Sequence, residues 1–153
     1  MESIRIVDND ELFTSIKQRL EKGETIPLQV SGSSMSPFLI HIRDTVFISK
    51  AIPPYKKGDI VFFQRKTGQY VMHRICKIDR DGNLYLIGDG QTVVEGPIGP
   101  EQVFGMIKQV VRKGKVIEEG MPVWNFFSKY WVNLRRTRTI IIKFITNLLI
   151  KNK

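Results

Sequence analysis

Two residues in this chain combine a reactive side chain with neighbours that would hold it in place. Ser34 lies within residues 33–37 (Ser-Ser-Met-Ser-Pro), where a proline stiffens the segment after the hydroxyl. His73 lies within residues 71–75 (Val-Met-His-Arg-Ile), a pattern that predicts a strand. A serine hydroxyl is a useful nucleophile only when an adjacent base takes its proton, and histidine can do so near neutral pH. The pair therefore predicts a serine hydrolase site, with Ser34 as the nucleophile and His73 as the general base.

A histidine base also needs a carboxylate that orients it and stabilises its charged form. Asp89, within residues 88–90 (Gly-Asp-Gly), is the first candidate, and Glu95 is the second. A Gly-Asp-Gly run is also a turn signature in its own right, so a purely structural role for Asp89 stays open. We therefore expect the catalytic set Ser34, His73 and Asp89, with Glu95 as the alternative orienter.

The reactive side chains also have plainer interpretations. A serine shortly before a proline suits an ordinary turn, so Ser34 alone would not indicate catalysis. His41 is the rival base, in a polar segment that predicts a loop. Cys76 is expected on the opposite face of its strand from His73, as a buried apolar filler. One cysteine and two separated histidines lack the spacing of a metal site, so we expect no metal and no cofactor.

Several short segments occur in an order that is found in known peptidases. They are residues 29–39 around Ser34, 57–63 (Lys-Gly-Asp-Ile-Val-Phe-Phe), 73–75 (His-Arg-Ile), 88–90 and 103–105 (Val-Phe-Gly). In order and approximate spacing they resemble the type I signal peptidases and the related LexA-type self-cleaving serine peptidases. The resemblance covers about residues 27–107. It depends on the combination of segments, because each of them alone is a weak signal.

The base distinguishes the branches of this superfamily. LexA-type enzymes and typical bacterial signal peptidases have a lysine where the third segment begins, whereas this chain has His73. In this it resembles the histidine-dependent signal peptidases of the endoplasmic reticulum, archaea and spore-forming bacteria. Their usual Ser-Gly-Ser-Met has a hydroxyl two residues before the nucleophile, where this chain has Gly32. Their usual Gly-Asp-x-Asn is Gly-Asp-Gly-Gln here (residues 88–91), and Glu95 stands where a later Asp would fall.

The resemblance implies a serine endopeptidase of the signal-peptidase type that cleaves a protein or peptide precursor at or near a membrane. It also implies that the backbone N–H of Ser34 contributes to an oxyanion hole, and that small residues occupy the first and third positions before the cut. One alternative is a LexA-type regulator, which cuts its own chain at an Ala-Gly or Cys-Gly bond upstream of the nucleophile. Residues 1–33 contain neither Ala nor Cys, which disfavours it. The other alternative is a non-enzymatic membrane- or peptide-binding module on the same fold.

The length of 153 residues, 42% of them hydrophobic, predicts one domain with a substantial core. Short Val/Ile/Phe runs between Gly and Pro residues favour a mainly β fold, here a partly barrel-like antiparallel peptidase domain. Strands are expected near 27–31, 45–49, 59–64, 69–78, 83–88 and 103–112. We expect three parts: an amphipathic N-terminal helix (1–26, with Leu12, Phe13, Ile16 and Leu20 on its apolar face), the catalytic domain (27–119) and a basic amphipathic helical tail (120–153).

Positive charge is concentrated towards the end of the chain. Residues 106–153 hold 11 Lys and Arg against 2 Asp and Glu, whereas the first 105 residues hold 13 of each class. In the tail, apolar side chains recur at helical spacing: Ile141, Phe144, Ile145, Leu148 and Leu149. The stretch is shorter than the roughly 20 apolar residues of a spanning helix, so we expect no transmembrane span and a peripheral contact with the membrane interface. Docking of the tail on the body is one alternative. Nucleic-acid binding is the other, and it is disfavoured because no binding motif accompanies the charge.

Overall fold

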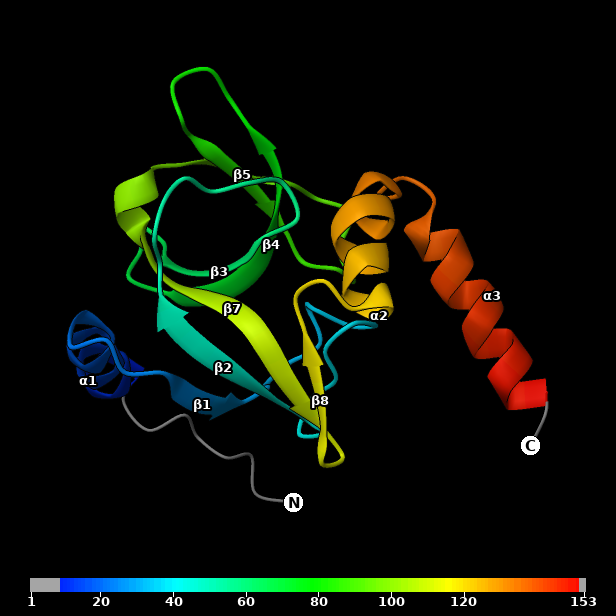
Figure 1. Cartoon of the computed structure of the whole chain (residues 1–153). Helices are drawn as coiled ribbons and strands as arrows, with labels where there is room; N and C mark the ends of the chain where they lie inside the picture. Colours follow the sequence, from blue (N-terminus) through cyan, green and yellow to red (C-terminus); the bar gives the residue numbers. More distant parts are fainter. Residues whose placement is uncertain (1–8, 152–153) are drawn as a thin grey trace.

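The computed structural model describes residues 9–151 and is built on one antiparallel sheet (Figure 1). Its strands are β1 (Ile26–Gln29), β2 (Asp44–Lys50), β3 (Ile60–Gln64), β4 (Tyr70–Ile78), β5 (Leu84–Ile87), β6 (Glu95–Ile98), β7 (Val103–Arg112) and β8 (Lys115–Glu118). They follow the order β1-β2-β7-β3-β4-β5-β6, and β8 pairs with β7 outside this path. The path begins at β1 and ends at β6, so the sheet is not closed.

The sheet curls round its interior (Figure 1) and buries side chains on both of its faces. Because side chains alternate along a strand, β4 contributes to two apolar clusters. Met72 packs against the first cluster, whereas Ile75 belongs to the second. The first cluster also contains Met35 and Phe38, which flank Ser34 on the C-terminal side. The mainly β, partly barrel-like fold predicted from the sequence is confirmed.

Helix α1 (Asn9–Glu21) covers the first cluster. Phe13, Ile16 and Leu20 are buried in that cluster, and they recur at the spacing of one helical face. Leu12, which we also expected on this face, is instead 44% exposed. The first eight residues of the predicted N-terminal part lie outside the described residues. Helix α1 therefore packs against the part of the sheet formed by β1, β2 and β7.

Two strands lie where the sequence did not predict them. β6 contains Pro97, and a proline cannot donate to a sheet ladder, so the Gly-Pro pair indicated a loop. The strand is nevertheless tolerated because β6 is at the edge of the sheet. β8 returns from β7 through a two-residue turn at Lys113 and Gly114, whose φ angles of 50° and 77° suit a type I′ hairpin turn.

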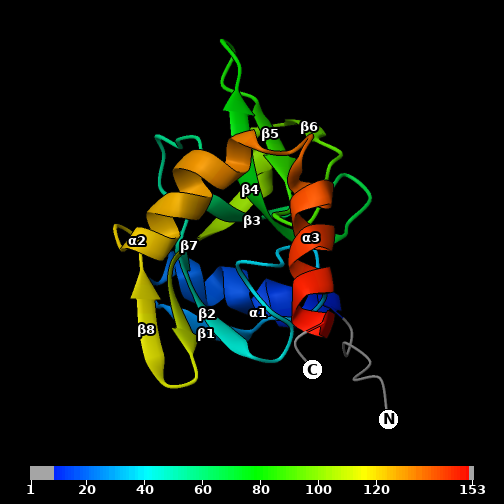
Figure 2. The same ribbon diagram turned by 90° about the vertical axis from the view of Figure 1, so that its right-hand side faces the viewer.

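The C-terminal segment divides into a docked part and a projecting helix. The docked part begins with α2 (Pro122–Asn125) and continues through a π-helical turn and a 3₁₀ turn, which end at Asn133. It buries Trp124, Trp131 and Val132 against the body. Helix α3 (Arg138–Lys151) then runs off the outer side of the molecule (Figures 1 and 2). Within residues 9–151, no helix is long and apolar enough to cross a membrane.

Candidate active site

The loop that carries Ser34 is anchored by its neighbours on both sides. Met35 and Phe38 are buried, and the Phe38 ring packs edge-on against Trp124, with 5.4 Å between ring centroids. On the other side Gly32 has a φ of +85°, a conformation that favours glycine, and its N–H donates to Nδ1 of His41 at 3.0 Å. Ser34 itself is half-buried. The serine therefore lies on a short loop whose two ends are fixed.

The main chain of Ser34 rests on the turn that follows β5. The N–H of Gly90 donates to the carbonyl oxygen of Ser34 at 2.9 Å. A Cβ added at Gly88 would lie 2.3 Å from that same oxygen, and one added at Gly90 would lie 2.8 Å from the carbonyl of Ser36. Any side chain at these two positions would force the backbones apart. The two glycines therefore allow the nucleophile loop and the turn to approach closely.

His73 lies next to this contact along β4. Arg74 pairs with Ile87 in the β4–β5 ladder. Extending that antiparallel register by one residue places Gly88 across from His73. Because Gly88 abuts the carbonyl of Ser34, the Ser34 loop lies at the end of the β4–β5 pair that carries His73.

The imidazole of His73 is held neutral by its surroundings. The residue is 3% exposed, and burial lowers its pKa to about 4. The nearby carboxylate of Glu95 opposes this shift, and Arg65 adds to it. Nδ1 is buried and has no hydrogen-bond partner within the described part of the chain, and it lies 3.8 Å from Oε1 of Glu95. Near neutral pH this histidine can therefore accept a proton.

Glu95 is the carboxylate that faces His73. It begins β6, and Arg65, which follows β3, binds both of its oxygens at 2.6 and 2.8 Å. This paired hydrogen bond fixes the plane and position of the carboxylate. The separation of 3.8 Å is longer than a hydrogen bond, so an orienting contact would require a small approach of the two side chains.

Asp89, the first orienter predicted from the sequence, lies elsewhere. It is fully buried, and Nε and Nη2 of Arg74 donate to its two oxygens, each at 2.8 Å. Nη1 of the same arginine donates to the carbonyl of Gly58 at 2.9 Å. Among the described residues, Asp89 has no hydrogen bond or ion pair with His73. In the structure Glu95 is therefore the carboxylate near His73, whereas Asp89 is bound by Arg74.

The remaining reactive side chains have structural partners. Nδ1 of His41 accepts the Gly32 N–H on the exposed side of the nucleophile loop, so that lone pair is already occupied. Cys76 is half-buried rather than a buried filler, and its thiol donates to the carbonyl of Tyr85 at 3.3 Å. Burial raises the pKa of the thiol, which disfavours the reactive thiolate. Within residues 9–151, no cluster of three or more His, Cys, Asp and Glu side chains is placed to hold a metal ion.

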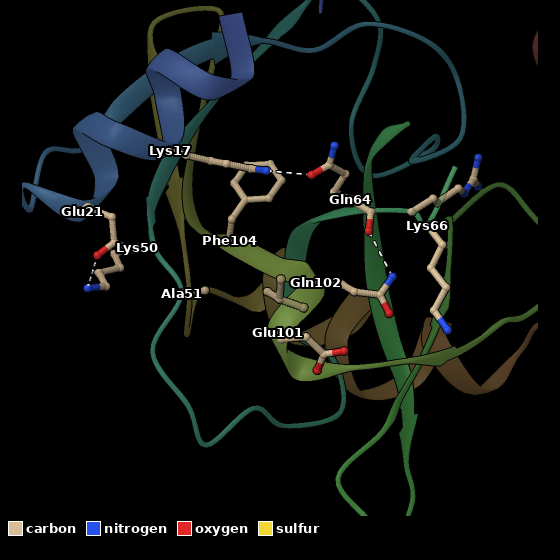
Figure 3. A pocket seen from close by; sticks show the side chains of 11 residues that line it. Lys17, Glu21, Lys50, Ala51, Gln64, Lys66, Glu101, Gln102 and Phe104 are labelled. Atoms are coloured by element: carbon tan, nitrogen blue, oxygen red, sulfur yellow. Dashed lines mark hydrogen bonds and ion pairs between the residues drawn. The ribbon is translucent and has the colours of Figure 1, made fainter. Parts of the chain in front are cut away.

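A polar hollow of about 470 Å³ lies between α1 and the ends of β2, β3 and β7 (Figure 3). Lys17 crosses it to donate to Gln64 at 2.8 Å, and Lys50 pairs with Glu21 at its rim. None of Ser34, His73 and Asp89 lines this hollow. Because none of the candidate catalytic residues reaches it, this hollow is not where we place the chemistry.

Three arginines around the site carried little or no sequence signal. Arg74 follows His73 directly, and Arg65 stands in a polar turn, so neither was identified as the partner of a particular carboxylate. Arg138 is fully buried, yet the sequence does not distinguish it from its exposed neighbours Arg135 and Arg136. Only the fold shows which of these cations is enclosed.

Comparison with known families identifies the family of this chain. A serine peptidase needs a nucleophilic serine and an adjacent base, and Ser34 and His73 are the candidates for these two roles. The model of the Peptidase S24-like family matches residues 2–117, and the chain belongs to this family. Membership supports a serine peptidase or a LexA-like self-cleaving protein as its type. No curated protein and no solved structure matches the chain.

Proposed function

We propose that this protein is a serine endopeptidase of the signal-peptidase type that cleaves a protein or peptide precursor at a membrane surface. The observation that carries the proposal is the contact between the Ser34 loop and the Gly88–Gly90 turn, beside a buried neutral His73. Family membership supports the peptidase type. The histidine base and the membrane are further parts of the proposal.

The chemistry follows from the atoms available. Nδ1 of His73 faces Glu95, so Nε2 is the nitrogen left to take the proton from the Ser34 hydroxyl. The Ser34 oxygen attacks the scissile carbonyl, and the backbone N–H of Ser34 donates to the developing oxyanion. The imidazolium then returns its proton to the leaving amine, which leaves an acyl-enzyme. Water attacks this ester with His73 again as the base and releases the new carboxyl end.

Glu95 is the orienter in this proposal. A charged imidazole in a buried position is costly, and a carboxylate at its Nδ1 offsets part of that cost. Arg65 holds Glu95 so that a shift of about 1 Å completes the Nδ1–H···O hydrogen bond. Such contacts are often long in a free enzyme and shorten when substrate binds.

A comparison of peptide N-termini from cells with wild-type protein and cells with the Ser34→Ala variant tests the activity. We expect an N-terminus that appears only with the wild type, since the variant lacks the hydroxyl but keeps the loop. Ser33→Ala is the matched control, one residue away in the same loop, and should retain cleavage. Identical N-termini in wild type and Ser34→Ala would overturn the proposed activity and favour a non-enzymatic binding module.

The membrane part of the proposal is supported by α3. Phe144, Leu149 and Ile150 are each at least 65% exposed, and Ile145 and Leu148 are nearly half exposed. Lys143 and Lys151 are exposed on this helix, and the sequence has no acidic residue after Glu119. Apolar side chains and cations on one projecting helix suit the interface of an anionic bilayer, where each cation adds about 1 kcal/mol.

Vesicle co-sedimentation tests this part. Deletion of residues 139–153 removes the projecting helix but keeps the docked part, and it should release the protein from anionic vesicles. The Phe144→Ser/Leu148→Ser variant keeps every charge and should also bind more weakly, because apolar burial contributes independently of charge. Undiminished binding by the truncated protein would remove α3 from the proposal.

A LexA-type self-cleaving regulator is the second candidate, favoured by the family match and by Gly32 in the nucleophile segment. Intact-mass measurement of purified wild type and Ser34→Ala during incubation distinguishes the two. Fragments that form only in the wild type, at a rate independent of protein concentration, would support self-cleavage. A stable intact mass together with precursor cleavage would support the peptidase.

A further inference from the structure

The turn beneath Ser34 is held from its far side by the C-terminal segment, beyond the part of the chain that matches the family. Arg138 is fully buried at the start of α3. Its Nη1 donates to the carbonyl oxygens of Gly88 at 2.9 Å, Asp89 at 3.2 Å and Gln91 at 3.0 Å. One guanidinium thus binds three backbone oxygens of a single turn.

Trp131 completes the contact. Its indole N–H donates to the carbonyl of Asp89 at 2.8 Å, and the side chain is buried. Nη2 of Arg138 donates to the carbonyl of Trp131 at 3.0 Å, and the guanidinium lies 5.5 Å from the centre of the indole ring. We call Trp131 and Arg138 the carbonyl clamp.

The turn lies between this clamp and the nucleophile. On its inner side the N–H of Gly90 binds the carbonyl of Ser34, and Gly88 abuts the same oxygen. The side chain of Asp89 is held independently by Arg74. A movement of the turn is therefore transmitted to the backbone of Ser34, because glycine leaves no flexible side chain between the two.

The burial of Arg138 is costly, which argues against a merely incidental contact. Burial lowers the pKa of the guanidinium, the charge of Asp89 opposes this, and Arg74 adds to it. Nε of Arg138 is also buried without a partner within residues 9–151. If the tail needed only an anchor, Trp124 and Trp131 would supply apolar burial without this cost.

We propose that Trp131 and Arg138 are positioning residues for Ser34 and act through the Gly88–Gln91 turn, so that the functional catalytic unit extends to residue 138. The inference rests on the proposed peptidase function. A displacement of about 1 Å in a reacting group can cost on the order of a hundredfold in rate. Loss of the clamp should therefore lower kcat and leave KM nearly unchanged, since neither residue is placed to touch substrate.

The kinetic test uses full-length protein and a short soluble peptide taken from the cleavage site identified in cells, without vesicles. Arg138→Gln and Trp131→Phe should each lower kcat by roughly tenfold to a hundredfold. Trp131→Phe keeps a buried ring and removes only the N–H, so it remains informative if Arg138→Gln does not fold. Arg136→Gln is the matched control, because it removes the same charge from an exposed neighbour and should leave kcat unchanged. Wild-type kcat in a folded Trp131→Phe or Arg138→Gln variant would overturn the inference.

Hydrogen exchange separates failure of this inference from failure of the proposed function. The Gly90 amide, which donates to Ser34, should exchange about tenfold faster or more in Ser34→Ala/Arg138→Gln than in Ser34→Ala alone. Amides of α1 serve as the internal control and should not change. This measurement requires no activity, so equal Gly90 exchange in the two proteins would reject the clamp whether or not the protein cleaves peptides.

Discussion

His73 and Arg74 are adjacent on β4, and each lies near a carboxylate, but the two pairs differ in completeness. Arg74 donates to both oxygens of the buried Asp89 at 2.8 Å, and a third N–H of Arg74 donates to the carbonyl oxygen of Gly58. His73 is nearly as buried, yet its Nδ1 stops 3.8 Å short of Glu95. The Arg74–Asp89 pair is within hydrogen-bond distance at both carboxylate oxygens, whereas the His73–Glu95 pair is beyond hydrogen-bond distance.

The difference separates a structural role from a chemical one. Breaking a buried ion pair leaves one charge buried without its partner, so the Arg74–Asp89 pair matters for stability. An arginine does not give up its proton in proteins, so this pair is not suited to proton transfer. A buried imidazole with an unused nitrogen carries a free-energy cost that substrate binding can relieve. At neutral pH, changes to the Arg74–Asp89 pair should therefore affect mainly stability, and changes to His73 and Glu95 should affect mainly activity.

The largest effect on stability is expected from Asp89→Ala. The change leaves the Arg74 guanidinium buried without its carboxylate, which should lower the free energy of unfolding by about 3–5 kcal/mol. Urea denaturation measures this loss. Arg74→Met/Asp89→Leu removes both charges and should recover a substantial part of it. If Asp89→Ala lowered the free energy of unfolding by less than about 1 kcal/mol, the Arg74–Asp89 pair would not have the structural role assigned to it.

The matching change on the other side of β4 is His73→Gln, which should lower kcat by about 10²–10⁴-fold because it removes the general base. Stability at neutral pH should change little, since the wild-type side chain is already neutral there. Steady-state cleavage of the peptide substrate gives the rate. His41→Gln is the control and should retain most activity. If His41→Gln were the inactive variant instead, His41 rather than His73 would be the general base.

The lowered pKa of His73 also predicts how stability depends on pH. Between its unfolded value near 6.5 and its folded value of about 4, the unfolded chain binds a proton that the folded chain does not. This contribution therefore destabilises the protein by about 3 kcal/mol as the pH falls from 6.5 to 4. In His73→Gln it should be absent, so wild type and variant should diverge in urea titrations at pH 4.5 relative to pH 7. Parallel curves would show that the histidine is not held neutral.

Glu95→Gln should have the smallest effect. We expect kcat to fall about tenfold, because an oriented carboxylate no longer stabilises the imidazolium, whereas the free energy of unfolding should change by less than about 1 kcal/mol for a partly exposed pair. The acidic limb of the kcat profile should also move to lower pH, since Glu95 raises the pKa of His73. A loss in Glu95→Gln as large as in His73→Gln would require a more direct role for the carboxylate.

Local patterns predicted much of this structure because they depend on neighbouring residues alone. The six expected strands are found with small shifts at their ends. Ser34 and His73 were singled out by their own segments. β6 was missed because Gly96-Pro97 is a loop signal, which is overridden at a sheet edge.

Partner choices were harder to predict because they depend on distant contacts. A sequence shows that Asp89 and Glu95 both follow β5, but only the fold shows that Arg74 binds Asp89 and that His73 lies near Glu95. The sequence predicted one basic amphipathic tail over residues 120–153 and did not separate a docked part from a projecting part. Trp124 and Trp131 are instead buried against the body, and only α3 keeps the exposed apolar pattern.

The carbonyl clamp has a consequence for how this chain can diverge. All the acceptors that Arg138 and Trp131 use on the turn are main-chain oxygens, and these are present whatever residue supplies them. Substitution at Gln91 therefore leaves these acceptors in place, which accommodates the departure from the usual Gly-Asp-x-Asn pattern at this position. Among related chains, Arg138 should accordingly vary together with the presence of a docked C-terminal segment, and independently of residue 91. An alignment in which the identity of residue 138 varies together with that of residue 91 would contradict the view that Arg138 recognises only main-chain oxygens.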